Sequence, residues 1–126
     1  MKLSTFMVIT AIVAFLFGLA FLLVAGTLMS FYGVSLSPGG LIVARLFGAA
    51  LLGFAVLTWS ARNAEESEAL RAIILALFIS DAIGFIVALI GQLAGVLNAL
   101  GWSTVIIYLL LALGFGYFQF MNRSSS

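Results

Sequence analysis

Residues 5–29 read TFMVITAIVAFLFGLAFLLVAGTLM, a run without a single charged side chain. About 20 consecutive apolar residues form a helix long enough to cross the ~30 Å hydrocarbon core of a bilayer. The apolar part of a secretory signal is only about 7–15 residues long and ends in a small-residue cleavage site. No such site closes this run. We therefore expect a retained membrane-spanning helix at 5–29.

The rest of the chain has the same character. Of its 126 residues, 65% are hydrophobic and 7% are charged, and the mean hydropathy is +1.35. Soluble domains have roughly 45–50% apolar and about 25% charged residues, and even a larger one buries only about 70% of its unfolded surface. The composition therefore predicts that lipid, not water, surrounds the folded chain.

Three further apolar segments are long enough to cross a bilayer, and turn-forming or charged residues separate them. A backbone in lipid must satisfy its own hydrogen bonds, which such long apolar segments do as helices. The sequence predicts an all-α, integral membrane four-helix bundle in one transmembrane domain, with helices at about 5–29, 41–60, 70–97 and 103–120. In the charged connection 61–69, Asn63 and Glu66 have the spacing of a helix capping box. Its three glutamates are either part of this helix start or a docking surface.

The basic residues predict an orientation. Four spans put both termini on one side, and positive residues favour the cytoplasmic side. That side carries Lys2, Arg62, Arg71 and Arg123, whereas the opposite side has only Arg45. We expect both termini and the 61–69 loop in the cytoplasm, with the chain in the inner or plasma membrane. The sequon 122–124 would then stay unglycosylated.

Small residues at spacings of three and four mark faces where membrane helices touch. Gly48 belongs to such a face in the second helix. In the third helix the face comprises Gly84, Ala88, Gly91 and Gly95. These faces predict a compact bundle, or a bundle that also packs against a membrane-protein partner or a second copy of the chain.

Asp81 lies on the same face, three residues before Gly84, within the apolar run LALFISDAIGFIVALIG at 75–91. The spacing predicts that its carboxyl points at protein rather than lipid, near the middle of the membrane. An ionised aspartate there costs on the order of 2.5–3.5 kcal/mol on insertion scales. The group must therefore be paired, hydrated or protonated. Arg45 is the charged candidate partner, unless it extends to the outer surface, and Ser80, Thr58 and Tyr108 are neutral candidates.

Several functions have no suitable side chains. The chain has no cysteine and no histidine, which removes thiol chemistry and the usual zinc and haem ligands. A net charge of +1 provides no basic field for nucleic acid. One deep carboxyl and a few hydroxyls are poor material for catalysis. We expect no enzyme, no cofactor, no bound metal and no nucleic-acid partner.

Two functions remain. The first is an accessory or structural subunit that packs in a larger membrane complex. The second is a small proton-coupled transporter, or a ligand-binding membrane protein, that uses Asp81. Four-helix exporters of the small multidrug resistance type have a similar size, but their hallmark glutamate in the first helix has no counterpart in 5–29. Asp81 would have to take that role from the third helix.

Residues 44–77, ARLFGAALLGFAVLTWSARNAEESEALRAIILAL, carry a resemblance. With Arg45, Gly48, Gly53, Trp59 and Arg62, this segment looks like small bacterial four-helix integral membrane proteins of unknown function. The resemblance implies a four-helix membrane fold and leaves the activity open.

Overall fold

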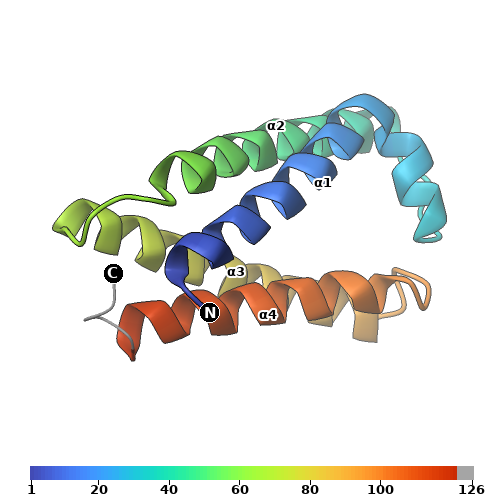
Figure 1. Cartoon of the computed structure of the whole chain (residues 1–126). Coiled ribbons are helices and arrows are strands. Elements are labelled where there is room, and N and C mark those ends of the chain that lie inside the picture. The colour runs from blue at the N-terminus through green and yellow to red at the C-terminus, as the bar shows by residue number, and fades with distance from the viewer. Residues whose placement is uncertain (122–126) are drawn as a thin grey trace. The chain divides into compact units, whose positions relative to one another are not determined.

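The computed structural model describes residues 1–121, and over this range the protein is helical and contains no strand (Figure 1). Its four helices are α1 (Leu3–Phe31), α2 (Pro38–Ala61), α3 (Glu68–Leu93) and α4 (Gly101–Phe120). All four are long and apolar enough to cross a membrane. Arg123 and the sequon at 122–124, which entered the orientation argument, lie outside the described residues.

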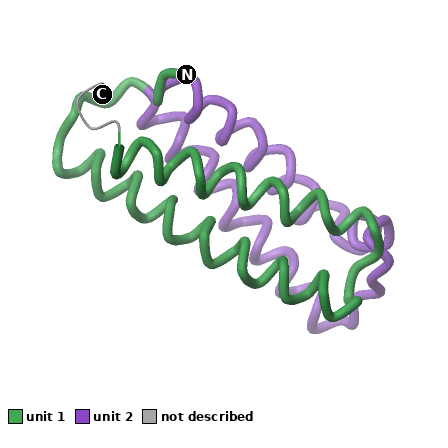
Figure 2. The backbone as a smooth tube through the Cα atoms, turned by 90° about the horizontal axis from the view of Figure 1, so that it is seen from below, with its two compact units in different colours: residues 1–3, 63–126 green, residues 4–62 purple. Residues whose placement is uncertain are grey.

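The chain divides into two compact units, shown in different colours in Figure 2. Residues 4–62 form one unit, which contains nearly all of α1 and the whole of α2. Residues 1–3 belong with the chain from Asn63 onward, which contains α3 and α4. Each unit is therefore a helical hairpin, and each is described below by itself.

The first hairpin is held by a close approach of two helix backbones. A Cβ atom added at Gly48 of α2 would lie 2.7 Å from the backbone nitrogen of Leu22 and 2.8 Å from the carbonyl oxygen of Gly18. Only glycine leaves room for this approach. Next to it, the rings of Phe21 and Phe47 meet edge to face at 5.0 Å between centroids, a favourable aromatic geometry. Gly48 is thus a packing residue of the α1/α2 hairpin.

The first helix bends near its end. Val24 has the non-helical dihedral angles φ −137° and ψ 40°, and the turns after it run in a new direction (Figure 1). The segment has no proline, and the nearest glycine, Gly26, follows Val24 by two residues. A Cβ atom added at Gly26 would have no neighbour within 4 Å, so this residue contributes no packing that would hold the helix straight. The single helix expected at 5–29 therefore has two directions.

The second hairpin packs along the full length of α3 and α4. Near the turn, Gln92 lies against Gly101, and its Nε2 donates to the carbonyl oxygen of Asn98 at 3.1 Å. Farther along, the ring of Phe78 lies over Gly116, where a Cβ atom would be 3.0 Å from the ring. Phe78 also meets Phe120 edge to face at 5.4 Å. These contacts fix the antiparallel register of the two helices.

In both hairpins the first helix is followed by a glycine in the left-handed conformation. Gly33 after α1 and Gly95 after α3 have positive φ angles of 79° and 77°. Around Gly95, the amides of Val96 and Gly95 donate to the carbonyls of Gly91 and Gln92, each at 3.1 Å. This pair of hydrogen bonds with a left-handed glycine is the Schellman motif, which stops an α-helix. It corrects the expected helix end at 97: α3 stops at Leu93, and Gly95 lies outside it.

The start of α3 also differs from the expected one. Ser67, not Asn63, is the N-cap residue, and its hydroxyl accepts a hydrogen bond from the Leu70 amide at 3.1 Å. A serine cap satisfies one of the amides that a helix start leaves without an intrahelical partner. Asn63 precedes the helix by several residues, so the spacing to Glu66 does not form the predicted cap.

Candidate functional site

One face of α3 is less exposed than the others. Its residues alternate at spacings of four and three, the period of a packed helix seam. They are buried in the N-terminal half and half-buried from Asp81 onward, in the order Leu70, Ile74, Leu77, Asp81, Gly84, Ala88 and Gly91. Large side chains on the other faces, such as Ile83, Ile86 and Val87, are exposed. Asp81 therefore shares a face with Gly84, Ala88 and Gly91, whereas Gly95 does not belong to it.

The surroundings of Asp81 come from α4. Tyr108 lies on Gly84, one turn from Asp81, so closely that a Cβ atom at Gly84 would be 2.6 Å from the ring carbon Cδ1. The Oδ2 atom of Asp81 is shielded from solvent and has no hydrogen-bond partner among the described residues. A shielded carboxyl oxygen without a hydrogen-bond partner is costly, so a proton or a ligand at this position would lower the free energy.

The other three candidate partners of Asp81 are placed differently from Tyr108. Ser80 is exposed on α3. Thr58 is fully buried in α2, but its hydroxyl donates to the carbonyl oxygen of Phe54 at 2.8 Å in its own helix. Arg45 is exposed on α2, in the other compact unit. Of the four candidate partners of Asp81, Tyr108 is placed one turn away within the same hairpin, and a pairing with Arg45 stays a prediction.

A second polar cluster joins the ends of α3 and α4. The Nη1 atom of Arg71 donates to the carbonyl oxygen of Phe118 at 2.6 Å, and the Nε atom pairs with Glu66 Oε1 at 2.7 Å. Carbonyls at a helix C-terminus lack intrahelical partners and form the negative end of the helix dipole. Arg71 therefore caps α4 from the neighbouring helix. From the sequence, Arg71 was used only as one of the positive charges that predict the orientation. No sequence pattern indicates that residue 71 contacts residue 118.

The outward face of α2 is the third feature. Arg45, Ala49 and Gly53 follow one another at spacings of four, and all three are exposed. No atom lies within 4 Å of a Cβ added at Gly53. Two small residues next to one basic side chain therefore form an open strip, here called the α2 strip. Gly48, on another side of the same helix, is already used by α1.

No family model, curated protein sequence or solved structure matches this chain. The resemblance of residues 44–77 to small bacterial four-helix membrane proteins thus stays a prediction. Residues 1–121 contain no group of three or more histidine, cysteine, aspartate or glutamate side chains arranged to hold a metal ion.

Proposed function

We propose that this protein is an integral membrane protein, with both termini in the cytoplasm, that packs as an accessory subunit in a larger membrane complex. Its four apolar helices support the insertion. Large apolar side chains are exposed on every helix, for example Leu16, Val43, Val87 and Leu113, which suits contact with acyl chains. Lys2, Arg62 and Arg71 support the orientation through the excess of positive charge on one side.

The α2 strip is the observation that carries the subunit proposal. In lipid, helices associate through small residues that allow close approach. Gly48 and Gly84 are engaged within their own hairpins, whereas Ala49 and Gly53 are open. Arg45 adds a charge inside a candidate span, where an unpaired charge is costly. A partner helix with small residues and an acidic side chain would satisfy both features.

The test is co-purification from native membranes. The tagged full-length chain, extracted in a mild detergent, is expected to bring down a stoichiometric membrane-protein partner. Gly53→Leu is expected to reduce the recovered partner at least tenfold, because the larger side chain holds the partner helix away. Ala76→Leu is the matched control, since it adds similar bulk to an exposed position on another helix, α3.

Recovery of the chain alone under several mild detergents would contradict the subunit proposal. Equal loss of the partner with Gly53→Leu and Ala76→Leu would instead contradict the assignment to the α2 strip. Circular dichroism of each purified variant separates loss of docking from loss of folding.

A second function is favoured by Asp81, whose Oδ2 has no hydrogen-bond partner in the described chain. In this alternative, the carboxyl binds and releases a proton during transport or holds a ligand beside Tyr108. Asp81→Asn removes the titratable group at nearly constant volume. It is expected to abolish proton flux in liposomes loaded with a pH-sensitive dye while leaving the helical content unchanged.

Asp81→Glu is the control for this experiment, because it retains the carboxyl and should keep part of the flux. An Asp81→Asn protein that does not fold would assign Asp81 a structural role. Unchanged flux in a folded Asp81→Asn protein would exclude a proton-carrying role for Asp81.

A further inference from the structure

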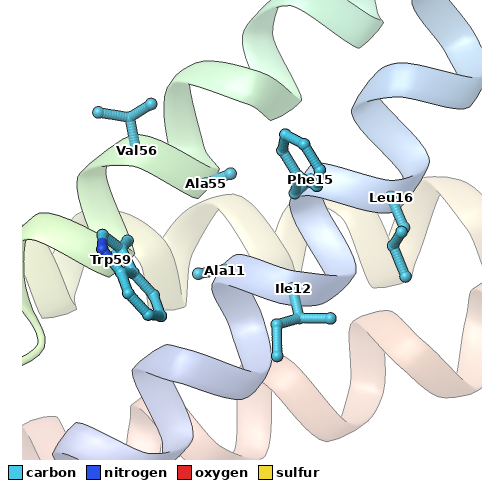
Figure 3. A pocket seen from close by; sticks show the side chains of 7 residues that line it. All are labelled: Ala11, Ile12, Phe15, Leu16, Ala55, Val56 and Trp59. Carbon is cyan, nitrogen blue, oxygen red and sulfur yellow. The ribbon is translucent and has the colours of Figure 1, made fainter.

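A groove of about 340 Å³ runs between α1 and α2 on the surface of the first hairpin (Figure 3). Its lining is apolar and comes from both helices: Ala11, Ile12, Phe15, Leu16, Ala55, Val56 and Trp59. Binding sites for small molecules typically measure about 300–1,000 Å³. The groove is therefore large enough for part of a ligand, and the chemistry of its lining requires that part to be hydrocarbon.

The groove exists because small residues stand where larger ones would fill it. Ala11 points toward Trp59, and Ala55 points toward Phe15 (Figure 3). Both alanines are nearly buried, whereas Ile12, Phe15 and Trp59 are each about half exposed and form the rim. The groove is thus open along one side to whatever surrounds the hairpin.

One end of the groove carries a positive charge. The guanidinium carbon of Arg62 lies 3.9 Å from the ring centroid of Trp59, and Arg62 Nη1 donates to the Trp59 carbonyl oxygen. Stacking on the indole and this hydrogen bond hold the guanidinium beside the groove at the C-terminal end of α2. The remaining guanidinium donors match the oxygens of a phosphate. Tryptophan and arginine together are typical of the level of the lipid headgroups.

We propose that this groove binds one anionic phospholipid, with an acyl chain between α1 and α2 and the headgroup phosphate on Arg62. The inference rests on membrane insertion, as proposed above, but does not depend on a protein partner. From Ala55 to Arg62, α2 covers roughly 10 Å along its axis. An acyl chain that enters beside Trp59 would follow the groove over this depth, while the charged head stays at the surface.

The test uses the full-length chain, reconstituted with equal amounts of phosphatidylglycerol and phosphatidylcholine that have identical acyl chains. After extraction in a mild detergent, native mass spectrometry counts the lipids retained. We expect one lipid per chain, with phosphatidylglycerol favoured about fivefold, the ratio that one arginine near an anionic surface supplies. Arg62→Gln is expected to abolish the headgroup preference while one lipid is still retained.

Ala55→Leu is expected to remove the bound lipid, because its side chain fills the groove, and Ala50→Leu on another side of α2 is the control. Ile12→Trp provides a second filling variant at an exposed rim position, where the added bulk does not disturb helix packing. Retention without headgroup preference in the unmodified chain, or full retention in both filling variants, would overturn the proposal. Extraction of the chain from membranes by alkaline carbonate would instead overturn membrane insertion.

Discussion

At the scale of single residues, one amino acid type serves several purposes in this chain. Gly48 lets two backbones approach, Gly53 stands open on the α2 strip, and Gly95 provides a left-handed turn. The sequence shows all of them in similar apolar surroundings. Spacing predicted Gly48 and Gly84 as packing residues, and both lie in close contacts. It also placed Gly95 on a packing face, because a spacing of four residues does not distinguish packing from a helix end.

The contact at Gly48 predicts a sharp effect of adding one methyl group. In Gly48→Ala, the new Cβ would meet the backbone of Leu22 and Gly18, which cannot rotate away. We expect a loss of about 1–3 kcal/mol in unfolding free energy, the typical cost of overpacking. Unfolding of the detergent-solubilised chain by SDS, followed by circular dichroism, measures it. Gly53→Ala on the same helix should be nearly neutral, and equal losses in the two variants would contradict the assigned contact.

Asp81 shows what residue spacing can and cannot provide. Its distance of three residues from Gly84 placed it on the less exposed face of α3, where the structure has it. Tyr108 was one of several candidate partners, and the register of α3 against α4 brings it to Gly84. That register depends on the length of the turn at 94–100 and on Phe78 and Gly116, none of which a single helix pattern reveals.

At the scale of helices, the ends matter most. The existence of four helices was predicted from the composition, because a backbone in lipid would have few alternatives to helices. Their ends depend on individual hydrogen bonds, such as the Ser67 cap of α3 and the Schellman motif at Gly95. The kink at Val24 could not be predicted from a proline, because this segment contains none. The sequence therefore predicts helix number more accurately than helix bounds or direction.

The two glycines of the 91–95 pair are predicted to respond in opposite ways. Gly95→Ala forces a side chain into a left-handed conformation, which costs roughly 1–2 kcal/mol. Gly91→Ala adds a methyl group to a helical residue with open space around it, so we expect unchanged or slightly raised stability. SDS unfolding of the two variants side by side makes the comparison. A greater loss for Gly91→Ala would mean that the pair acts as a packing motif after all.

The Arg71 cluster predicts a difference between its two partners. Arg71→Gln removes the charged donor from the Phe118 carbonyl, and hydrogen bonds to charged groups contribute about 1.5–3 kcal/mol. Glu66→Gln breaks only the exposed ion pair, and such pairs contribute about 0–1 kcal/mol. We expect faster amide hydrogen exchange in the last turn of α4 for Arg71→Gln than for Glu66→Gln. Equal exchange in the two variants would show that the ion pair, not the cap, matters.

At the scale of the whole molecule, each hairpin has its own internal contacts, and the apolar surface exceeds what the two hairpins bury. The sequence predicted an excess of apolar surface but not where on the helices that surface lies. The groove between α1 and α2 could not be predicted from the sequence, because it depends on which residues of the two helices lie opposite each other. The sequence did not predict the α2 strip. Arg45 and Gly53 were named together only among the residues that carry the resemblance of 44–77.

The proposed orientation is tested by single cysteines, since the natural chain contains none. Ser35→Cys lies in the connection between α1 and α2, and Glu65→Cys lies between α2 and α3. In sealed cells, a membrane-impermeant maleimide is expected to label position 35 and to leave position 65 unmodified until the membrane is opened. The reverse pattern would invert the topology, and labelling of both positions would contradict a membrane span at α2.

The bend at Val24 has a consequence for the kind of membrane that suits this protein. A straight α1 of 29 residues would measure roughly 43 Å, whereas the part before the bend covers roughly 30 Å. The 20 residues of α4 also cover roughly 30 Å and include no bend. In the proposed membrane setting, a straightened α1 would reach farther than the bent one, whereas α4 has no bend to straighten. If the helices cross a bilayer as proposed, α4, the shortest of the four, would limit the bilayer thickness that the chain can span without deforming the membrane.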